Sequence, residues 1–544
     1  MLWPIFEKFI KKNKRSRLRK IMRGYRVLKQ SGKIDRIAFL KEALTEQSLG
    51  LTDKHFSSYL MGMNGYLIGE IVVRQYLLFR IGGLNLNKAL LSSLGEKKGK
   101  VIFPLPKAWR IIISQHGFKV ANIRSSLLWQ LYIIGAWLYG LSQIVKTIFS
   151  GLISLIDKPM KQKKYVYFSR LSYGNLPQGI NGQKGYDIVS WYLQWKGKIK
   201  NIGAIHHSVS NVPTKIIGDV DLVFQQDILP SIRGLKVIFC YVFWGIIASS
   251  IALLDCFRGR WWHALLLNQA ALAAQARILP EDSLAQEYLF HNSDWIYRPF
   301  WTYEAERRGS GIILYFYSTN CEAFKKQDSY PPISFGYKAM SWSRYLVWDE
   351  YQEDFVRRAV NEQANVSIVG PIWFQSSAIV MPPLDRSSVA VFDVTPHRHS
   401  RYVTLGLDNE FYTPTVTNPF LEHILNTTRQ YDFDMLWKMK RNIGRIAHPF
   451  YRRLADQLAN NKHVMLVDPE ISAIRVIESS VAVISMPFTS TALIAKEMGK
   501  PSIYYDPSGM LQKDDRAAHG IQVISEIGEL ENWLKTIKSV NKEQ

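Results

Sequence analysis

The chain has 544 residues, of which 47% are hydrophobic, and its formal net charge is +24. This length suggests two to four domains, and the hydrophobic content excludes an intrinsically disordered chain. The positive charge favours an anionic partner such as nucleic acid, anionic lipid or a phosphorylated substrate. The three cysteines, Cys240, Cys256 and Cys321, are too few and too scattered for a disulfide framework or a zinc site, and they fit a reducing compartment such as a bacterial cytoplasm.

The first 36 residues interleave apolar and basic side chains, which is unlike the order of a secretory signal. They contain 13 Lys or Arg and only two acidic residues, Glu7 and Asp35, and their apolar residues recur at roughly helical spacing. Two interpretations are open. The segment is either a helix lying on an anionic membrane surface, or a solvated basic helix that packs its apolar stripe on the rest of the domain.

Two stretches, 127–145 and 237–254, are free of charged residues. Both are at the lower limit of the ~20 residues that a membrane-spanning helix needs. Strand-like runs at 220–224 and 287–292 flank the second stretch, and strands of one sheet cannot lie on opposite sides of a membrane. We therefore expect a monotopic helix that dips into the interface, with a core helix and a true span as alternatives. The Arg and paired Trp of 257–267 suit the headgroup level.

Residues 1–158 are predicted to be mostly helical and possibly membrane-associated. From residue 159, apolar runs alternate with amphipathic stretches, which predicts parallel sheets covered by helices. The expected strands are 164–169, 220–224, 287–292, 311–318, 344–349 and 365–370, and then 388–396, 433–441, 462–469, 481–488 and 501–507. The pattern restarts near residue 370. We therefore predict two doubly wound, Rossmann-like α/β domains, 159–370 with an apolar helix 237–267, and 371–544, facing each other across a cleft.

Three hydroxyl residues, Thr489, Ser490 and Thr491, stand between the strand at 481–488 and a helix that Gly499 closes. One interpretation is simple N-capping of the helix. The other is a phosphate cradle, because helix N-terminal amides and the macrodipole favour an anion. Capping explains one hydroxyl and not three, so we favour phosphate binding. Thr395, in the polar turn that closes strand 388–396, is a further candidate at the same sheet edge.

A cluster of cations, Lys438, Lys440 and Arg441, lies at the end of a strand in the same domain. Strand alternation puts Lys438 and Lys440 on one face. Clustered cations at such a position are costly unless an anion balances them, which suggests the donor phosphate. The alternative is a solvated surface run on a protein that is already basic.

The Lys-x-Lys-Arg segment, the "PFTS" turn of residues 487–490 and the sequence "GKPSIYYDPSG" together resemble bacterial polysaccharide biosynthesis proteins of the PFTS motif family. Residues 292–320 resemble the same group, and the resemblance covers roughly residues 160–535. It implies a GT-B-fold glycosyltransferase of O-antigen, lipopolysaccharide or capsule synthesis. The pattern is also similar to sialyltransferases, Kdo transferases and teichoic-acid-type glycerophosphotransferases, which carry Lys-x-His-Pro and paired serines. Here Lys440-Arg441 and Thr489-Ser490 stand at those positions, and the missing His-Pro leaves the donor open.

The resemblance implies that the second domain holds a nucleotide-sugar, whose leaving phosphate is stabilised by cations and helix amides. No metal or other cofactor is expected, since no Asp-x-Asp box stands at a strand end. The first domain should hold a lipid-linked or glycan acceptor beside a general base. The candidates are Glu304, Asp349 and His207. An acid at a helix start, such as Glu304, also occurs simply to compensate the helix dipole.

Two further classes of function stay open. A GT-B-like glycerophosphotransferase or sugar-nucleotide epimerase would use the same fold, but an epimerase needs no membrane-seeking elements. The net charge alone would also allow a non-enzymatic nucleic-acid-binding protein. We expect no nucleic-acid partner, because the basic residues concentrate in two places and the aromatic residues sit in apolar runs. The expected location is peripheral, or monotopic, at the cytoplasmic face of the inner membrane, on an anionic lipid surface.

Overall fold

The computed structural model describes a large part of the chain. The described residues are 40, 43–44, 84–94, 99–156, 163–177, 187–196, 202–210, 212, 214–217, 220–293, 297–319, 321–325, 329–333, 335–372, 381–397, 411–439, 444 and 447–543. The basic segment 1–36 and the cations Lys440 and Arg441 lie outside the described residues, so the predictions made for them stay predictions.

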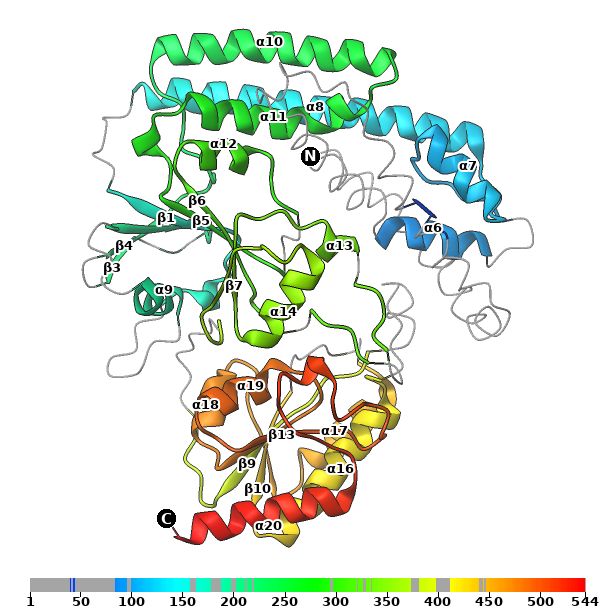
Figure 1. The fold of residues 1–544 in the computed structure, drawn as a ribbon, viewed down its shortest axis with the longest axis vertical. Coiled ribbons are helices and arrows are strands. Elements are labelled where there is room, and N and C mark those ends of the chain that lie inside the picture. The colour runs from blue at the N-terminus through cyan, green and yellow to red at the C-terminus, as the bar shows by residue number, and fades with distance from the viewer. Residues whose placement is uncertain are drawn as a thin grey trace.

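The described residues before the first sheet are mostly helical, as predicted. It comprises α6 (Leu84–Leu94), α7 (Lys107–Gln115) and α8 (Asn122–Ser154). Helix α8 packs against α10 (Leu235–Phe257) and α11 (Trp262–Ile278), and Figure 1 shows these three helices together at one end of the molecule. By length and composition, α8 and α10 are the two helices within the described residues that are long and apolar enough to cross a membrane.

The prediction of one apolar helix over 237–267 is wrong. The chain turns after α10, where Gly259 takes a φ of +83°, a backbone conformation that glycine adopts without strain. It then runs back as α11, which is buried along nearly its whole length. Trp262 is buried with it and not at the surface where a headgroup-level residue would lie.

The first sheet has the strand order β3-β4-β2-β1-β5-β6-β7-β8, parallel except for β3 against β4. All six strands expected in this domain are present, and β2, which ends at His207, and the short edge strand β3 add to them. The strands are β1 (Tyr165–Phe168), β2 (Ala204–His207), β3 (Lys215–Ile217), β4 (Val220–Phe224), β5 (Glu287–His291), β6 (Gly311–Tyr315), β7 (Arg344–Val347) and β8 (Val366–Ile368). The domain's other helices are α9 (Ile188–Lys196), α12 (Trp301–Arg307), α13 (Phe335–Lys338) and α14 (Glu350–Ala359), with 3-10 turns at Tyr173–Asn175 and Glu281–Ser283.

The second sheet is parallel throughout, in the order β11-β10-β9-β12-β13-β14. The five expected strands are present, and the two-residue edge strand β14 adds to them. The strands are β9 (Ser388–Phe392), β10 (Asp434–Lys438), β11 (Val464–Leu466), β12 (Ala482–Ser485), β13 (Ser502–Tyr505) and β14 (Val523–Ile524). The helices are α16 (Pro414–Gln430), α17 (Pro449–Leu458), α18 (Ala473–Glu478), α19 (Ser490–Glu497) and α20 (Ile527–Glu543), with a 3-10 turn at Arg516–Ala518.

Both sheets are doubly wound. In the first, the chain passes from β1 to β2 on one side and later returns to β5 on the other side of β1. In the second, it passes from β9 to β10 and returns to β12 on the other side of β9. Such switch points are where ligands bind in open parallel sheets, outside the carboxyl ends of the strands. The carboxyl ends of β6 and β7 face the second domain (Figure 1), since Thr319 and Asp349, which follow them, contact Ser490 and His519.

Candidate active site

A cavity of about 230 Å³ lies between the two domains. It is placed at the switch point of the second sheet, because Val394 follows β9 and Thr489 follows β12. Its lining residues are Thr319, Glu322 and Phe324 of the first domain and Val394, Tyr412, Phe488, Thr489 and Ala517 of the second. The predicted "PFTS" turn therefore opens onto a cavity that both domains build.

The start of α19 lies beside this cavity, which its N-cap residue Thr489 lines. Thr489 is the N-cap residue, but its hydroxyl makes no cap hydrogen bond and instead donates to the Met486 carbonyl at 2.8 Å. The hydroxyl of Thr491 bonds that of Ser485, also at 2.8 Å. Among the residues that the structure describes, none accepts a hydrogen bond from the backbone N–H of Ser490, Thr491 or Ala492. Plain capping is therefore not what these hydroxyls do, and free amides mark the helix start.

Aromatic and hydroxyl contacts join the two domains around the same turn. The hydroxyls of Thr319 and Ser490 lie 3.2 Å apart across the interface. The ring of Phe324 meets that of Phe488 edge-on, with centroids 5.1 Å apart. Tyr412 donates its hydroxyl hydrogen to the carbonyl of Pro487 at 2.7 Å. The turn is thus held from several sides, which fixes the direction of the α19 amides.

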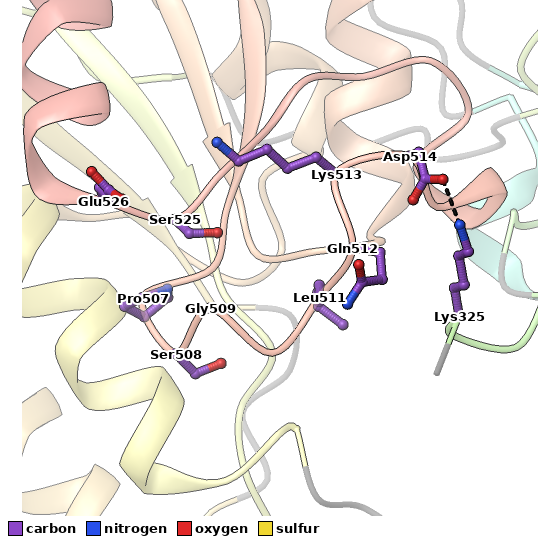
Figure 2. A pocket seen from close by; sticks show the side chains of 10 residues that line it. All are labelled: Lys325, Pro507, Ser508, Gly509, Leu511, Gln512, Lys513, Asp514, Ser525 and Glu526. Carbon is purple, nitrogen blue, oxygen red and sulfur yellow. Dashed lines mark hydrogen bonds and ion pairs between the residues drawn. The ribbon is translucent and has the colours of Figure 1, made fainter. Parts of the chain in front are cut away.

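A second, more open cavity of about 800 Å³ lies at the carboxyl ends of β13 and β14 (Figure 2). Lys325 from the first domain reaches Asp514 at its edge, and the backbone N–H of Lys325 donates to Asp515 at 2.8 Å. Phe324 lines the smaller cavity and Lys325 the larger, so the two cavities adjoin the same segment. The described part of the second sheet therefore offers room along its carboxyl edge for an elongated ligand.

Of the predicted bases, Asp349 lies at the domain interface. It caps α14, accepting from the Gln352 N–H at 3.0 Å, and its other oxygen accepts from Nδ1 of His519 at 2.7 Å. His519 lies two residues after the cavity-lining Ala517. Because Nδ1 donates to Asp349, the lone pair of His519 is left on Nε2. The pair has the arrangement of an oriented imidazole base, and it also ties the domains together.

Glu304 lies elsewhere. Its carboxylate is fully buried between α12 and α11, where Arg277 and Arg307 donate to its two oxygens at 3.1 and 2.9 Å. Nothing in the described chain places it beside either cavity, and both oxygens are occupied. The ion pair with Arg277 fastens α12 to α11, so a structural role accounts for this residue.

His207 is buried at the carboxyl end of β2. Its Nδ1 accepts from the Val209 N–H at 3.2 Å, which leaves the proton on Nε2. Burial lowers the pKa of its imidazole to about 4, with a smaller contribution from His206, so the ring is neutral at pH 7. In this tautomer Nε2 is a donor and not a base.

The remaining predicted donor-binding residues lie at the carboxyl edge of the second sheet. Lys438 ends β10, and its Nζ donates to the Pro469 carbonyl at 3.0 Å. Burial lowers the pKa of this lysine to about 8, while Asp468 and Glu470 oppose the shift. Thr395 is buried beyond the end of β9.

Several cavity-lining residues, notably Glu322, were not predicted from the sequence. Its carboxylate is nearly buried and is held by Arg358 at 2.5 Å, with Arg516 at 3.9 Å. The available signal was the polar turn after β6, "YSTNCE", which ends in this acid. Phe324, Tyr412 and Ala517 carried no such signal, since their place depends on the packing of one domain on the other.

The described residues contain no group of three or more His, Cys, Asp or Glu side chains that could hold a metal ion.

Two doubly wound domains with facing carboxyl edges and a cavity between them define a GT-B-like α/β protein, as predicted. Residues 241–534 match the family model described as "Polysaccharide biosynthesis PFTS motif protein". The chain belongs to this family, and its residues 487–490 read Pro-Phe-Thr-Ser. A search of curated protein sequences gave no match.

Several solved structures are similar in overall arrangement. The wall teichoic acid polymerase TagF is 12% identical with a TM-score of 0.38, over 76% of this chain and 91% of that one. The UDP-GlcNAc 2-epimerase from Methanocaldococcus jannaschii is 10% identical with a TM-score of 0.34, over 69% and 91%. TarM is 10% identical with a TM-score of 0.30, over 50% of this chain and 52%, about half, of TarM. We draw no residue correspondence from them.

Proposed function

We propose that this protein is a metal-independent glycosyltransferase that moves a sugar from a nucleotide-sugar to a lipid-linked or surface glycan in bacterial polysaccharide synthesis, such as O-antigen, lipopolysaccharide or capsule. The observation that carries the proposal is the interdomain cavity at the switch point, lined by Thr489, the residue that directly precedes the free amides of α19. Membership of the polysaccharide biosynthesis family supports it. The acceptor is met at the cytoplasmic face of the inner membrane.

In the proposed reaction, the donor phosphate lies at the N-terminus of α19. The helix dipole and the N–H groups of 490–492 stabilise the charge that develops as the bond from the anomeric carbon to the phosphate oxygen breaks. The cations of segment 438–441 balance the remaining charge. The rest of the nucleotide extends along the carboxyl edge toward the larger cavity (Figure 2).

The acceptor hydroxyl attacks the anomeric carbon from the side of the first domain and gives up its proton. We assign the general base to Glu322, the carboxylate that lines the cavity. The ion pair with Arg358 holds the carboxylate in place, and the proton that it accepts is released to solvent after the nucleotide leaves. Glu322→Gln should lower kcat at least a hundredfold and leave nucleotide affinity within twofold. Glu304→Gln is the matched control, because its carboxylate is remote from both cavities.

The first experiment is a thermal-shift panel of UDP-, GDP-, dTDP- and CMP-sugars on the full chain. One of them should raise the Tm, since a ligand at a hundredfold excess over its Kd stabilises by about 2.7 kcal/mol. A panel in which none raises the Tm would contradict the proposal. Product analysis then separates the alternatives, because an epimerase changes the donor without an acceptor and a glycerophosphotransferase requires CDP-glycerol.

A further inference from the structure

Helices α8 and α10 turn apolar stripes away from the protein. On α8, the exposed large side chains recur at intervals of three, four or seven residues: Leu127, Leu131, Ile134, Leu138, Val145 and Phe149. On α10 the same spacing gives Leu235, Phe239, Phe243, Ile246, Leu253 and Phe257. Spacing of this kind places each set on one face of its helix. A contiguous apolar surface of this extent is unusual on a soluble monomer and marks an interaction site.

The opposite faces of both helices are tightly packed, which fixes the stripes in their outward position. A Cβ on Gly245 of α10 would come within 2.7 Å of the Ile144 side chain on α8. One on Gly140 of α8 would come within 2.6 Å of Leu267 on α11. Helix α11 lies beneath both and packs on α12 of the first domain (Figure 1). The stripes therefore cannot turn inward without breaking this layer.

The charged residues on the two helices and at their ends are mostly basic. Helix α8 contains Arg124 and Lys146 and no acidic residue, and Lys146 pairs with Asp227 of the segment after β4. Lys236 is exposed at the start of α10, and Arg258 follows its end. The only acid in α10, Asp255, is buried, where it accepts from His263 at 2.6 Å and lies 3.5 Å from the exposed Arg258. An apolar stripe bordered by cations complements a lipid surface with anionic headgroups.

A second copy of the chain fits this surface less well. A twofold contact would place each cationic border against itself, and facing like charges are unfavourable. Spanning a bilayer also fits poorly. Helix α8 has 33 residues and is thus ~50 Å long, well beyond the ~30 Å hydrocarbon core. Both helices are fastened through α11 to a domain whose strands β4 and β5 flank the α10–α11 hairpin.

We propose that α8 and α10 form a monotopic docking face that inserts its apolar stripes into one leaflet of an anionic membrane. The phenylalanines enter the acyl region, and Arg124, Lys236 and Arg258 contact the phosphates of the headgroups. This inference goes beyond glycosyl transfer and does not depend on it, because membrane binding is measured without donor or acceptor.

The test is co-sedimentation of the full chain with vesicles of phosphatidylglycerol and phosphatidylethanolamine, and with vesicles of phosphatidylcholine. The wild type should bind the anionic vesicles more tightly. The double variant Phe239→Glu/Phe243→Glu should lose at least tenfold in vesicle affinity with an unchanged Tm, because both side chains are exposed. Phe450→Glu is the matched control. Phe243 and Phe450 are each 60% exposed, but Phe450 lies on α17 of the second domain, so its substitution should leave binding unchanged.

Three results would overturn the proposal. The first is equal vesicle binding by the double variant and the wild type. The second is a lipid-free wild-type dimer that the double variant converts to monomer, which would assign the face to a second copy. The third is resistance of the membrane-bound protein to extraction at alkaline pH, which would indicate spanning helices. Loss of the Tm shift with nucleotide-sugars, by contrast, would count against the proposed function alone.

Discussion

The outer faces of α8 and α10 and the N-terminus of α19 both lack partners within the described protein, but for opposite chemical reasons. The first is an array of apolar side chains, whose burial would contribute about 25 cal/mol for each Å² removed from water. The second is a set of backbone N–H groups, each of which gains most from a charged acceptor. The difference shows that the chemistry of a surface without a partner indicates its ligand. The apolar faces of α8 and α10 indicate lipid, and the free amides of α19 indicate phosphate.

The two regions also differ in how their sequence determines them. In α8 and α10, the apolar composition indicates a lipid partner, and the spacing of the apolar residues determines which face of each helix is turned toward that partner. At α19, three hydroxyls suggested a cradle, but the structure turns the hydroxyls of Thr489 and Thr491 inward and leaves the amides free. If the two regions are independent, a substitution in the helices should leave nucleotide binding unchanged.

The largest expected effect is a loss of stability at the contact between α11 and α12, beneath helices α8 and α10. Glu304→Ala should lower the free energy of unfolding by about 3 kcal/mol, because it leaves Arg277 in the α11–α12 contact without its carboxylate. Denaturant unfolding measures this loss. In the variant that remains folded, nucleotide affinity should equal that of the wild type. A fully stable variant that binds donor but has lost turnover would restore Glu304 as a catalytic residue.

The second prediction concerns the helix start. Ser490 is the first residue of α19, where proline is tolerated because the N–H has no intrahelical partner. Ser490→Pro removes that N–H and should weaken nucleotide binding at least tenfold if a phosphate accepts from it. Isothermal titration of the nucleotide measures the change.

Ser490→Ala is the matched control for this experiment. It removes the same hydroxyl and its contact with Thr319 but keeps the backbone N–H. We expect its affinity to stay within about threefold of the wild type. Equal affinities of the proline and alanine variants would show that phosphate does not bind at this helix start.

Much of the fold could be predicted from the sequence, because buried parallel strands appear as continuous apolar runs. Eleven expected strands are present, whereas β2 and the short edge strands β3 and β14 were not among those expected. The break between α10 and α11 was missed because Arg258 and Arg260 were interpreted as headgroup contacts. The site was predictable only in part. The turn at Thr489 follows a strand end in the chain, but Glu322 reaches the cavity only because two domains pack together.

The third prediction is a pH dependence. Lys438 uses one of its three N–H groups on a described acceptor, and its pKa is lowered to about 8 by burial. A bound phosphate favours the charged amine, so the nucleotide affinity should fall up to about tenfold as the pH rises from 7 to 9. In the free protein, the free energy of unfolding changes with pH in the opposite direction to the nucleotide affinity. The folded pKa lies below the unfolded value, so this group adds to the free energy of unfolding as the pH rises from about 8.

The control for that titration is Lys438→Arg, which stays charged throughout this pH range. Its nucleotide affinity should be independent of pH between 7 and 9. If the wild type shows the same flat profile, Lys438 does not contact the phosphate, and any cationic contribution from this loop belongs to Lys440 and Arg441.

The smallest expected effect separates the hydroxyl of Thr489 from the amides beside it. Thr489→Ala removes the hydrogen bond to the Met486 carbonyl and should lower the free energy of unfolding by about 1 kcal/mol, as for a typical buried hydrogen bond. Nucleotide affinity should change less than twofold, because the hydroxyl already points into the protein and every backbone N–H remains. Thermal unfolding and titration measure the two quantities independently. A variant of unchanged stability that no longer binds nucleotide would mean that the hydroxyl rotates outward when the donor arrives, so that the cradle consists of side chains as well as amides.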